Sequence, residues 1–340
     1  MKITSEEKFI FRALFSSERI DKKTLQELDY EKIIKLASSH LILPTLYSNL
    51  KEKNYLKFLE KEFVNYLKNI FDLNNERNKE FVREVKEISR LLNKNDINHV
   101  FLKSASYLLM KIYKCNGQRM IGDIDILIEE NDIQKANLIL EKIGYFNINE
   151  IDYFPDESHH HIRKVHEKNI FAIEIHKRPL NDPDSETETV RYLKSKLKIE
   201  GVNLMSRENC ALYLITNFQF HDKGAKYQRY SIRAMYDYFN IQNGQRKILN
   251  HKYGNVINDF FIPFYLFKID FNGYNIDELN KLNILRFKLK HRFLWYRVIE
   301  ELIINIVEKI RILPKRLKKI KRSRKYRSHL KQRIIDKLFF

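Results

Sequence analysis

The stretch from Arg119 to Ile128 sets the strongest limit on the architecture of this chain. Within it, Asp123 and Asp125 alternate with isoleucines, and such alternation of β-branched and polar residues indicates a strand buried on at least one face. Side chains two residues apart on a strand point to the same side, so the two carboxylates emerge together. A pair of this kind suits a hard divalent cation, above all Mg²⁺. The alternative is an Asp-x-Asp pair that merely ends a strand at a solvated edge.

Length and composition favour a helix-rich protein of two or three packed lobes. A chain of 340 residues exceeds what one hydrophobic core usually covers, and its 8 Gly and 6 Pro disfavour a loop-rich all-β protein. Cys115 and Cys210 are the only cysteines, so we expect no disulfide framework and a reducing cytoplasm. We find no signal-peptide pattern at the N-terminus and no run of ~18 apolar residues that would predict a transmembrane helix.

The hydrophobic periodicity changes along the chain and divides it into four parts. Residues 1–95 show helical spacing and predict an N-terminal helical lobe. Residues 96–180 alternate between strands and helices, which predicts a small α+β core with a mixed sheet. An acidic, turn-forming run at residues 181–189 separates this core from residues 190–312, which predict a C-terminal helical lobe. Residues 313–340 form a basic amphipathic tail.

A lone carboxylate, Glu174, lies inside an otherwise apolar predicted strand, residues 169–177. An unpaired buried charge is costly, so Glu174 needs a partner. If this strand lies beside the one that carries Asp123 and Asp125, the three carboxylates form one cluster around metal. His176 lies two residues further on and points to the same face.

Several short motifs occur together in a characteristic order. They are Leu28-Asp-Tyr-Glu, Leu36-Ala37, His40, Leu43-Pro-Thr-Leu-Tyr47, Phe101-Leu-Lys103, Arg119, Asp123-Ile-Asp-Ile-Leu127, Gly144-Tyr145, Glu174-Ile-His176, His221 and Arg233-Ala-Met-Tyr-Asp237. In this order and spacing the chain resembles the bacterial nucleotidyltransferases with a polymerase β-type fold, in a largely uncharacterised branch with helical flanking lobes. The resemblance implies a small mixed-sheet nucleotidyltransferase core flanked by N- and C-terminal helical lobes.

The resemblance also implies an activity and its residues. The enzyme would move a nucleoside monophosphate from a nucleoside triphosphate such as ATP to an acceptor hydroxyl and release pyrophosphate. Asp123, Asp125 and Glu174 would bind two Mg²⁺ ions, or Mn²⁺, and Glu174 would activate the attacking hydroxyl. Lys103 and Arg119 would neutralise phosphate charge. A small molecule or sugar is the expected acceptor. The alternative is a non-catalytic member that binds nucleotide or RNA.

One position departs from the pattern of this superfamily. Its first strand usually runs into a glycine followed by glycine or serine, whereas this chain has Lys103-Ser-Ala-Ser106. Ser104 opens a helix predicted to reach about Tyr113, with Ser104 or Ser106 as its cap, and offers a hydroxyl and a helix N-terminus to a phosphate. Its Cβ narrows the approach of the backbone. The missing glycine favours the non-catalytic alternative, and the three carboxylates oppose it.

Histidines leave two further questions open. A zinc site is an alternative use of the run His159-His-His161 together with His166 and His176. No cysteine joins them, so solvated or substrate-facing histidines are favoured. In the C-terminal lobe, His221 and Asp237 either hydrogen-bond between helices or, together with His176, line the acceptor pocket.

Positive charge is concentrated at the end of the chain. The net charge is +19, and residues 311–340 hold thirteen Lys or Arg against one acid, Asp336. Apolar residues recur among them at Leu317, Ile320, Tyr326, Leu330, Ile334, Ile335 and Leu338. RNA and an anionic membrane surface both fit the tail at 313–340, as does a solvated helix that packs its apolar side on the C-terminal lobe. The expected location is the cytoplasm, with peripheral association at the inner face of the membrane as an open alternative.

Overall fold

The structure is a computed structural model that describes residues 3–148, 159–161, 163–181, 185–242, 253–269, 279–324, 326–328 and 330–331. Its first part is helical and consists of α1 (Ser5–Phe15), α2 (Lys22–Gln26), α3 (Tyr30–Ser39), α4 (Leu43–Glu52), the short 3-10 helix η1 (Leu56–Phe58) and α5 (Lys61–Lys94). Thr4, Asp21 and Asp29 begin α1, α2 and α3, because each side chain accepts a hydrogen bond from the backbone N–H three residues further on.

A seven-stranded mixed sheet lies at the centre of the protein. Its strands are β1 (His99–Phe101), β2 (Asp123–Ile128), β3 (Phe146–Asn147), β4 (Lys164–Val165), β5 (Ala172–His176), β6 (Leu197–Ile199) and β7 (Val202–Leu204), in the spatial order β3-β4-β5-β2-β1-β7-β6. β2 runs parallel to β5 and antiparallel to β1. Ile124, Ile126 and Ile128 are fully buried, as expected for a strand in the middle of a covered sheet. The predicted α+β fold class is confirmed.

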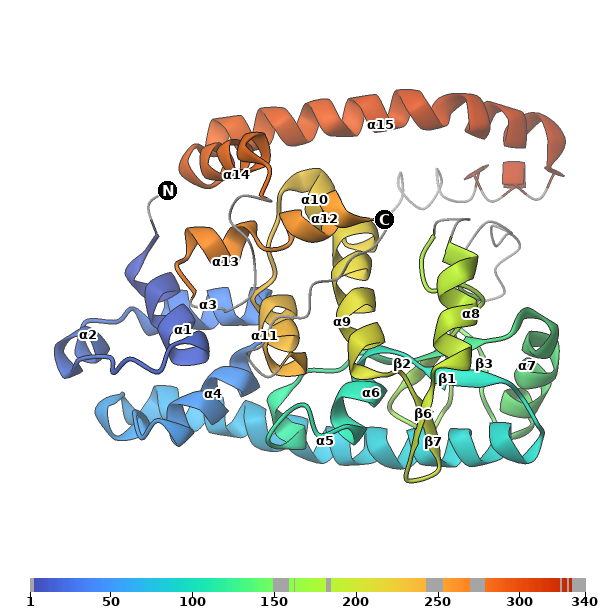
Figure 1. Cartoon of the computed structure of the whole chain (residues 1–340), viewed down its shortest axis with the longest axis horizontal. Helices are drawn as coiled ribbons and strands as arrows, with labels where there is room; N and C mark the ends of the chain where they lie inside the picture. Colours follow the sequence, from blue (N-terminus) through green and yellow to red (C-terminus); the bar gives the residue numbers. More distant parts are fainter. Residues whose placement is uncertain are drawn as a thin grey trace.

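Helices cover both faces of this sheet. Figure 1 shows α5 running beneath the sheet and α8 (Glu186–Lys194) above it, and both contact its strands. The other helical segments are α6 (Lys103–Leu109), η2 (Asn116–Gln118), η3 (Glu130–Asp132), α7 (Ile133–Lys142), α9 (Arg207–Thr216), the π-helical turn η5 (Asn217–His221), α10 (Gly224–Tyr227), α11 (Ile232–Ile241), α12 (Gly254–Asp259), α13 (Ile262–Leu266), α14 (Lys281–Arg292) and α15 (Leu294–Arg322). None of the helices in the described ranges combines the length and the apolar character that crossing a membrane requires.

The β6–β7 hairpin extends the sheet into residues 190–312, for which the sequence predicted only helices. Glu200 (φ 49°) and Gly201 (φ 82°) form its two-residue turn, and left-handed backbone at both positions is typical of tight hairpins. Ser89 and Asn93 of α5 donate hydrogen bonds of 3.1 and 3.0 Å to the carbonyl oxygen of Gly201. The hairpin is thereby tied to the helix beneath the sheet.

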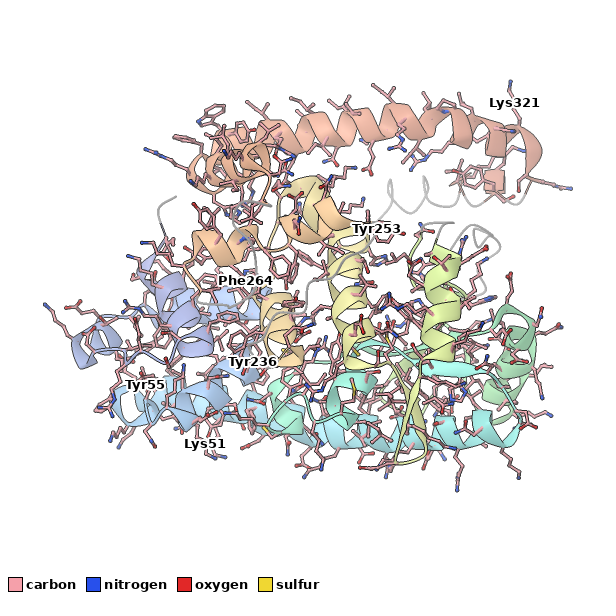
Figure 2. All side chains as sticks on the ribbon, in the orientation of Figure 1. Lys51, Tyr55, Tyr236, Tyr253, Phe264 and Lys321 are labelled. Atoms are coloured by element: carbon pink, nitrogen blue, oxygen red, sulfur yellow. The ribbon has the colours of Figure 1, made fainter. Side chains whose placement is uncertain are left out.

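Aromatic side chains join the N-terminal helices to the C-terminal ones. Phe11 stacks on Phe267 with ring centroids 4.1 Å apart. Phe15 meets Tyr236 and Phe264 edge to face, and Figure 2 labels the last two where the two groups of helices meet. The buried apolar residues of lobes and sheet form one continuous cluster.

Two predicted features fall partly outside the described residues. Residues 182–184 of the acidic run do so, and α8 already begins at Glu186. Residues 332–340 of the tail also lie outside, and with them Ile334, Ile335 and Leu338. The division into four domains therefore stays a prediction.

Acid is expected to destabilise the fold through His99 of β1. This side chain is fully buried, and burial lowers the pKa of its imidazole from 6.5 to about 4. Between these values the unfolded chain binds a proton that the folded protein excludes, so the free energy of unfolding falls as the pH falls, by about 1.4 kcal/mol per pH unit for one such group. Urea denaturation at pH values from 4.5 to 7.5 should show a shallower pH dependence for His99→Gln than for the parent protein. An equal slope in both proteins would contradict this assignment.

Candidate active site

The register of β2 and β5 brings carboxylates together. Asp125 and Glu174 are direct partners across the two parallel strands, and Asp123 lies two residues before Asp125. The three side chains and His176 share one face of the sheet, because paired residues and residues two apart along a strand point the same way. Ligand atoms of Asp125, Glu174 and His176 lie within 4.8 Å of one another, the one such group among the described residues. Asp123 is not a member of this group, although it is two residues from Asp125 on the same strand.

Asp125 is the most enclosed of these carboxylates, with 2% of its surface exposed. Its Oδ1 accepts a 2.7 Å hydrogen bond from Lys103 Nζ and lies 2.8 Å from His176 Nε2. Burial opposes ionisation, but the charge of Lys103 and the hydrogen bond from His176 outweigh it and hold the pKa of Asp125 below its ordinary value. Asp125 is therefore ionised.

His176 is neutral, because burial lowers the pKa of its imidazole. Its Nε2 faces the Asp125 carboxylate and thus carries the hydrogen. Nδ1 is left as an acceptor, and it is buried without a hydrogen-bond partner among the described residues. An unpaired buried acceptor next to a carboxylate cluster is expected where a ligand or its water completes the site.

Asp123 is half-buried beside the other two acids. Burial in the first place, and the charge of Asp125 in the second, raise the pKa of Asp123 to about 6. Lys103 and Arg163 act in the opposite direction and offset part of this effect. A bound cation would remove the repulsion between the carboxylates, so this electrostatic arrangement favours cation binding.

The donor set fits an oxygen-coordinated divalent cation. Asp123, Asp125 and Glu174 offer the carboxylate oxygens that Mg²⁺ and Mn²⁺ prefer. An imidazole is a poor ligand for Mg²⁺, but His176 donates to Asp125, and such hydrogen bonds orient a ligating carboxylate.

Of the histidines of the zinc alternative, His176 alone belongs to a group of possible metal ligands in the part of the chain that the structure describes. There, no group of metal-binding side chains joins His159, His161 and His166. His166 instead lies against Tyr145, with ring centroids 5.1 Å apart, and its Nδ1 accepts hydrogen bonds from its own turn.

Lys103 lies in the turn between β1 and α6. Its backbone is left-handed (φ 45°), a conformation that costs a residue with a Cβ about 1–2 kcal/mol. The turn lies between β1 and α6 and directs Nζ to Asp125. Left-handed backbone at a non-glycine residue is often found at functional sites. The left-handed residue is thus Lys103 itself, one residue before Ser104.

The predicted cap of the following helix is wrong. No side chain caps α6, which begins at Lys103. Ser106 Oγ donates to the carbonyl oxygen of Phe101 at 2.8 Å and accepts from Met205 N–H at 3.0 Å. Ser104 accepts a hydrogen bond from Arg119. Both serine hydroxyls form hydrogen bonds with residues outside α6, and neither caps this helix.

Arg119 and Asp237 form a buried ion pair. Arg119 Nε and Nη2 lie 3.1 and 3.0 Å from Asp237 Oδ2, and the two side chains are 8% and 2% exposed. Tyr113 donates to the other carboxylate oxygen of Asp237, and Arg119 Nη1 donates to Ser104 Oγ. The guanidinium also lies 5.0 Å from the ring centre of Tyr107. A predicted phosphate ligand and a predicted acceptor residue are therefore members of one buried network.

Polar residues of α5 hold the loop before β2, and the sequence analysis missed them. Asn74 and Asn78 donate hydrogen bonds of 3.0 and 2.7 Å to the carbonyl oxygen of Arg119. Arg77 donates to the carbonyl oxygen of Ile121. These contacts fix the backbone from which Arg119 projects and β2 begins. The sequence did offer a signal for them, because asparagines on an otherwise apolar helix face indicate buried polar contacts.

His159 connects the two predicted acceptor histidines. Its ring centroid lies 5.4 Å from that of His176 and 5.3 Å from that of His221. Burial lowers the pKa of His159 to about 3, so its imidazole is neutral. Burial raises the pKa of Tyr213 in α9, the charge of Lys103 acts in the opposite direction, and the Tyr213 hydroxyl is buried without a hydrogen-bond partner among the described residues. Sequence reasoning did not find Tyr213, because nothing local distinguishes it from a core tyrosine.

Comparison with known proteins identifies the family. The family described as uncharacterised nucleotidyltransferase matches residues 26–252, about two thirds of the chain, and this span contains every site residue named above. The chain belongs to this nucleotidyltransferase family. Members of this family are transferases of phosphorus-containing groups, so this nucleotidyltransferase is an enzyme of that class. The resemblance to nucleotidyltransferases that the sequence motifs indicated is thereby confirmed at the level of the family. No curated protein and no solved structure in the comparisons matches it.

Proposed function

We propose that the protein transfers a nucleoside monophosphate from a nucleoside triphosphate to an acceptor hydroxyl, in a reaction that depends on Mg²⁺ or Mn²⁺ and releases pyrophosphate. The observation that carries the proposal is the direct pairing of Asp125 with Glu174 across two parallel strands, with Asp123 two residues from Asp125. The family supplies the class of reaction. A cluster of carboxylates is what the metal-assisted form of that reaction requires.

Asp123, Asp125 and Glu174 would hold the divalent ions. When bound, these ions supply positive charge to the transferring phosphoryl group and to the leaving pyrophosphate. The side chain of Glu174 is 20% exposed, whereas that of Asp125 is 1% exposed. We therefore assign to Glu174 the acceptance of the proton from the incoming hydroxyl, since an acceptor can reach it.

The two cations of the site would serve the nucleotide differently. The side chain of Lys103 is 27% exposed, so its ammonium can contact a triphosphate beside Asp125. Arg119 is nearly enclosed and paired with Asp237. We propose that Arg119 acts on the nucleotide through Ser104, whose hydroxyl it positions.

The acceptor would bind on the side of the histidines. His159, His176 and His221 bring imidazoles together next to the carboxylates, and His221 is exposed. Neutral imidazoles both donate and accept hydrogen bonds, which suits a small molecule or sugar with several hydroxyl groups. Asp237 has both carboxylate oxygens engaged inside the network, so we do not assign it to the acceptor.

The test is a direct assay of transfer. Purified protein is incubated with each α-labelled nucleoside triphosphate, Mg²⁺ or Mn²⁺, and pools of small hydroxyl compounds and sugars, and both label transfer and pyrophosphate release are measured. We expect one nucleotide and one pool to give labelled product together with pyrophosphate, and a chelator to abolish both. Nucleotide binding without pyrophosphate release in any pool would favour the non-catalytic alternative.

A further inference from the structure

The last helix of the described chain, α15, is held to the body by charged side chains at its start. Glu300 pairs with Arg286 and Lys290 of α14 at 2.9 and 2.8 Å. Glu301 pairs with Arg229 at 3.2 Å. Figure 1 shows α15 extending from this attachment along the side of the molecule opposite α5.

The next turns of α15 continue the same pattern. Tyr227 of α10 donates a 2.6 Å hydrogen bond to Asn305 Oδ1. Glu308 pairs with Lys226 and, at 3.8 Å, with Lys223. The side of α15 that faces the body is therefore acidic and polar.

The opposite side of α15 is apolar and open to solvent. An apolar stripe runs along it in steps of three and four residues: Trp295, Ile299, Leu302, Ile306, Ile310, Leu313 and Leu317. Trp295, Leu302 and Ile310 are 62%, 58% and 65% exposed. A surface helix normally turns its apolar side to the core and its charged side to water. In α15 this arrangement is reversed, so the stripe needs a partner outside the described fold.

Positive charge accompanies the second half of the stripe. Residues 309–322 hold eight Lys or Arg and no acid. Figure 2 shows Lys321 at the far end of α15, away from the labelled residues of the core. The partner must therefore accept apolar side chains and cations along the same helix.

We propose that α15 docks on an anionic lipid bilayer, parallel to its surface. The apolar stripe would enter the boundary between headgroups and acyl chains, and the cations would contact anionic headgroups, the arrangement of a basic amphipathic helix at an interface. Trp295 is of the residue type that prefers this depth. The proposal is independent of the activity proposed above.

Charge and geometry favour the bilayer over two other partners. RNA would use the cations and leave the apolar stripe in water. A second copy of the chain would cover the stripe but add like charge to like charge in the basic half. From Trp295 to Leu317 the apolar residues of the stripe recur on average every 22/6, or about 3.7, residues. The left-handed coiled coil that two copies of such a helix commonly form requires a repeat of 3.5 residues, so the spacing does not favour this kind of dimer.

The protein carries its own reporter for this proposal. Trp295 is the single tryptophan of the chain and belongs to the stripe. Full-length protein is titrated with vesicles of phosphatidylcholine alone and of phosphatidylcholine with phosphatidylglycerol, and tryptophan emission and co-sedimentation are measured at low and high salt. We expect a shift of the emission to shorter wavelength with the anionic vesicles, and binding at least about tenfold weaker for neutral vesicles or at high salt.

Matched variants separate the stripe from hydrophobic surface in general. Leu302→Gln with Ile306→Gln should weaken binding to anionic vesicles by at least about tenfold, because it interrupts the stripe at its centre. Leu73→Gln with Leu138→Gln removes two similarly exposed apolar residues outside α15 and should leave binding unchanged. All four positions are exposed, so the fold is expected to survive in both variants.

Three outcomes would overturn the proposal. The first is an unchanged emission spectrum and no co-sedimentation with anionic vesicles. The second is salt-sensitive binding to RNA that displaces the protein from vesicles without any shift in emission, which would assign the basic residues to nucleic acid. The third is a shift that depends on protein concentration in the absence of lipid, together with a dimer in solution, which would assign the stripe to a second copy.

Discussion

Asp125→Asn is expected to lower nucleotidyl transfer by about three orders of magnitude. The substitution keeps the shape of the side chain but removes the charge that lies opposite Glu174 and that would bind the divalent cation in the proposed mechanism. Metal ions contribute several kcal/mol to such transition states, and each ~1.4 kcal/mol corresponds to a factor of ten in rate. Initial rates of pyrophosphate release at saturating triphosphate measure the effect.

Two companions and one control make this prediction specific. Asp123→Asn and Glu174→Gln should show losses of similar size, and they test the cluster even if Asp125→Asn unfolds, since both side chains are more exposed than Asp125. Asp72→Asn on the exposed face of α5 should keep full activity. Turnover that persists in all three cluster variants would place the activity elsewhere in the chain.

Asp237→Asn is expected to lower the free energy of unfolding by about 3–5 kcal/mol. It removes the negative charge that Arg119 faces inside the protein, and a buried charge without its counter-charge is strongly unfavourable. Tyr113 also loses the ionised acceptor of its hydrogen bond. Urea denaturation followed by circular dichroism gives the difference directly.

A double variant distinguishes an unpaired charge from lost packing. Arg119→Met combined with Asp237→Leu removes both charges and should recover much of the stability, because apolar replacement of a buried pair is often neutral. The exposed pair of Lys68 with Asp72 provides the comparison, and Asp72→Asn should cost less than ~1 kcal/mol. A small effect of Asp237→Asn would mean that Arg119 finds another partner or reaches water.

The carboxylate strand was predictable because its signal is local. Asp123 and Asp125 alternate with isoleucines, and Glu174 is isolated in an apolar run, so strand periodicity alone sets the face on which each side chain lies. The pairing of the two strands was a hypothesis that their sequence could not decide. It became visible only through the register that sets Asp125 opposite Glu174.

Other parts of the site depend on contacts between distant segments. Arg119 and Asp237 are 118 residues apart in the chain, and His159 and His221, whose rings lie close together, are 62 residues apart. No periodicity within a single segment can reveal such neighbours. The hairpin at Glu200-Gly201 was missed for a local reason, because Glu-Gly is not one of the Asn-Gly or Asp-Gly pairs that mark two-residue hairpin turns most strongly.

The polar residues on α5 link stability and site geometry. Asn74 and Asn78 fasten the loop that leads into β2, and Ser89 and Asn93 fasten the hairpin at the other side of the sheet. These two anchor points are separated by roughly 20 Å along a single helix, at a rise of ~1.5 Å per residue. A single helix thus sets the distance between the start of the central strand β2 and the β6–β7 hairpin at one edge of the sheet. Fraying or bending of α5 would therefore displace both the start of β2 and the hairpin. The positions of the carboxylates on β2 thus depend on the integrity of the helix that precedes them in the chain.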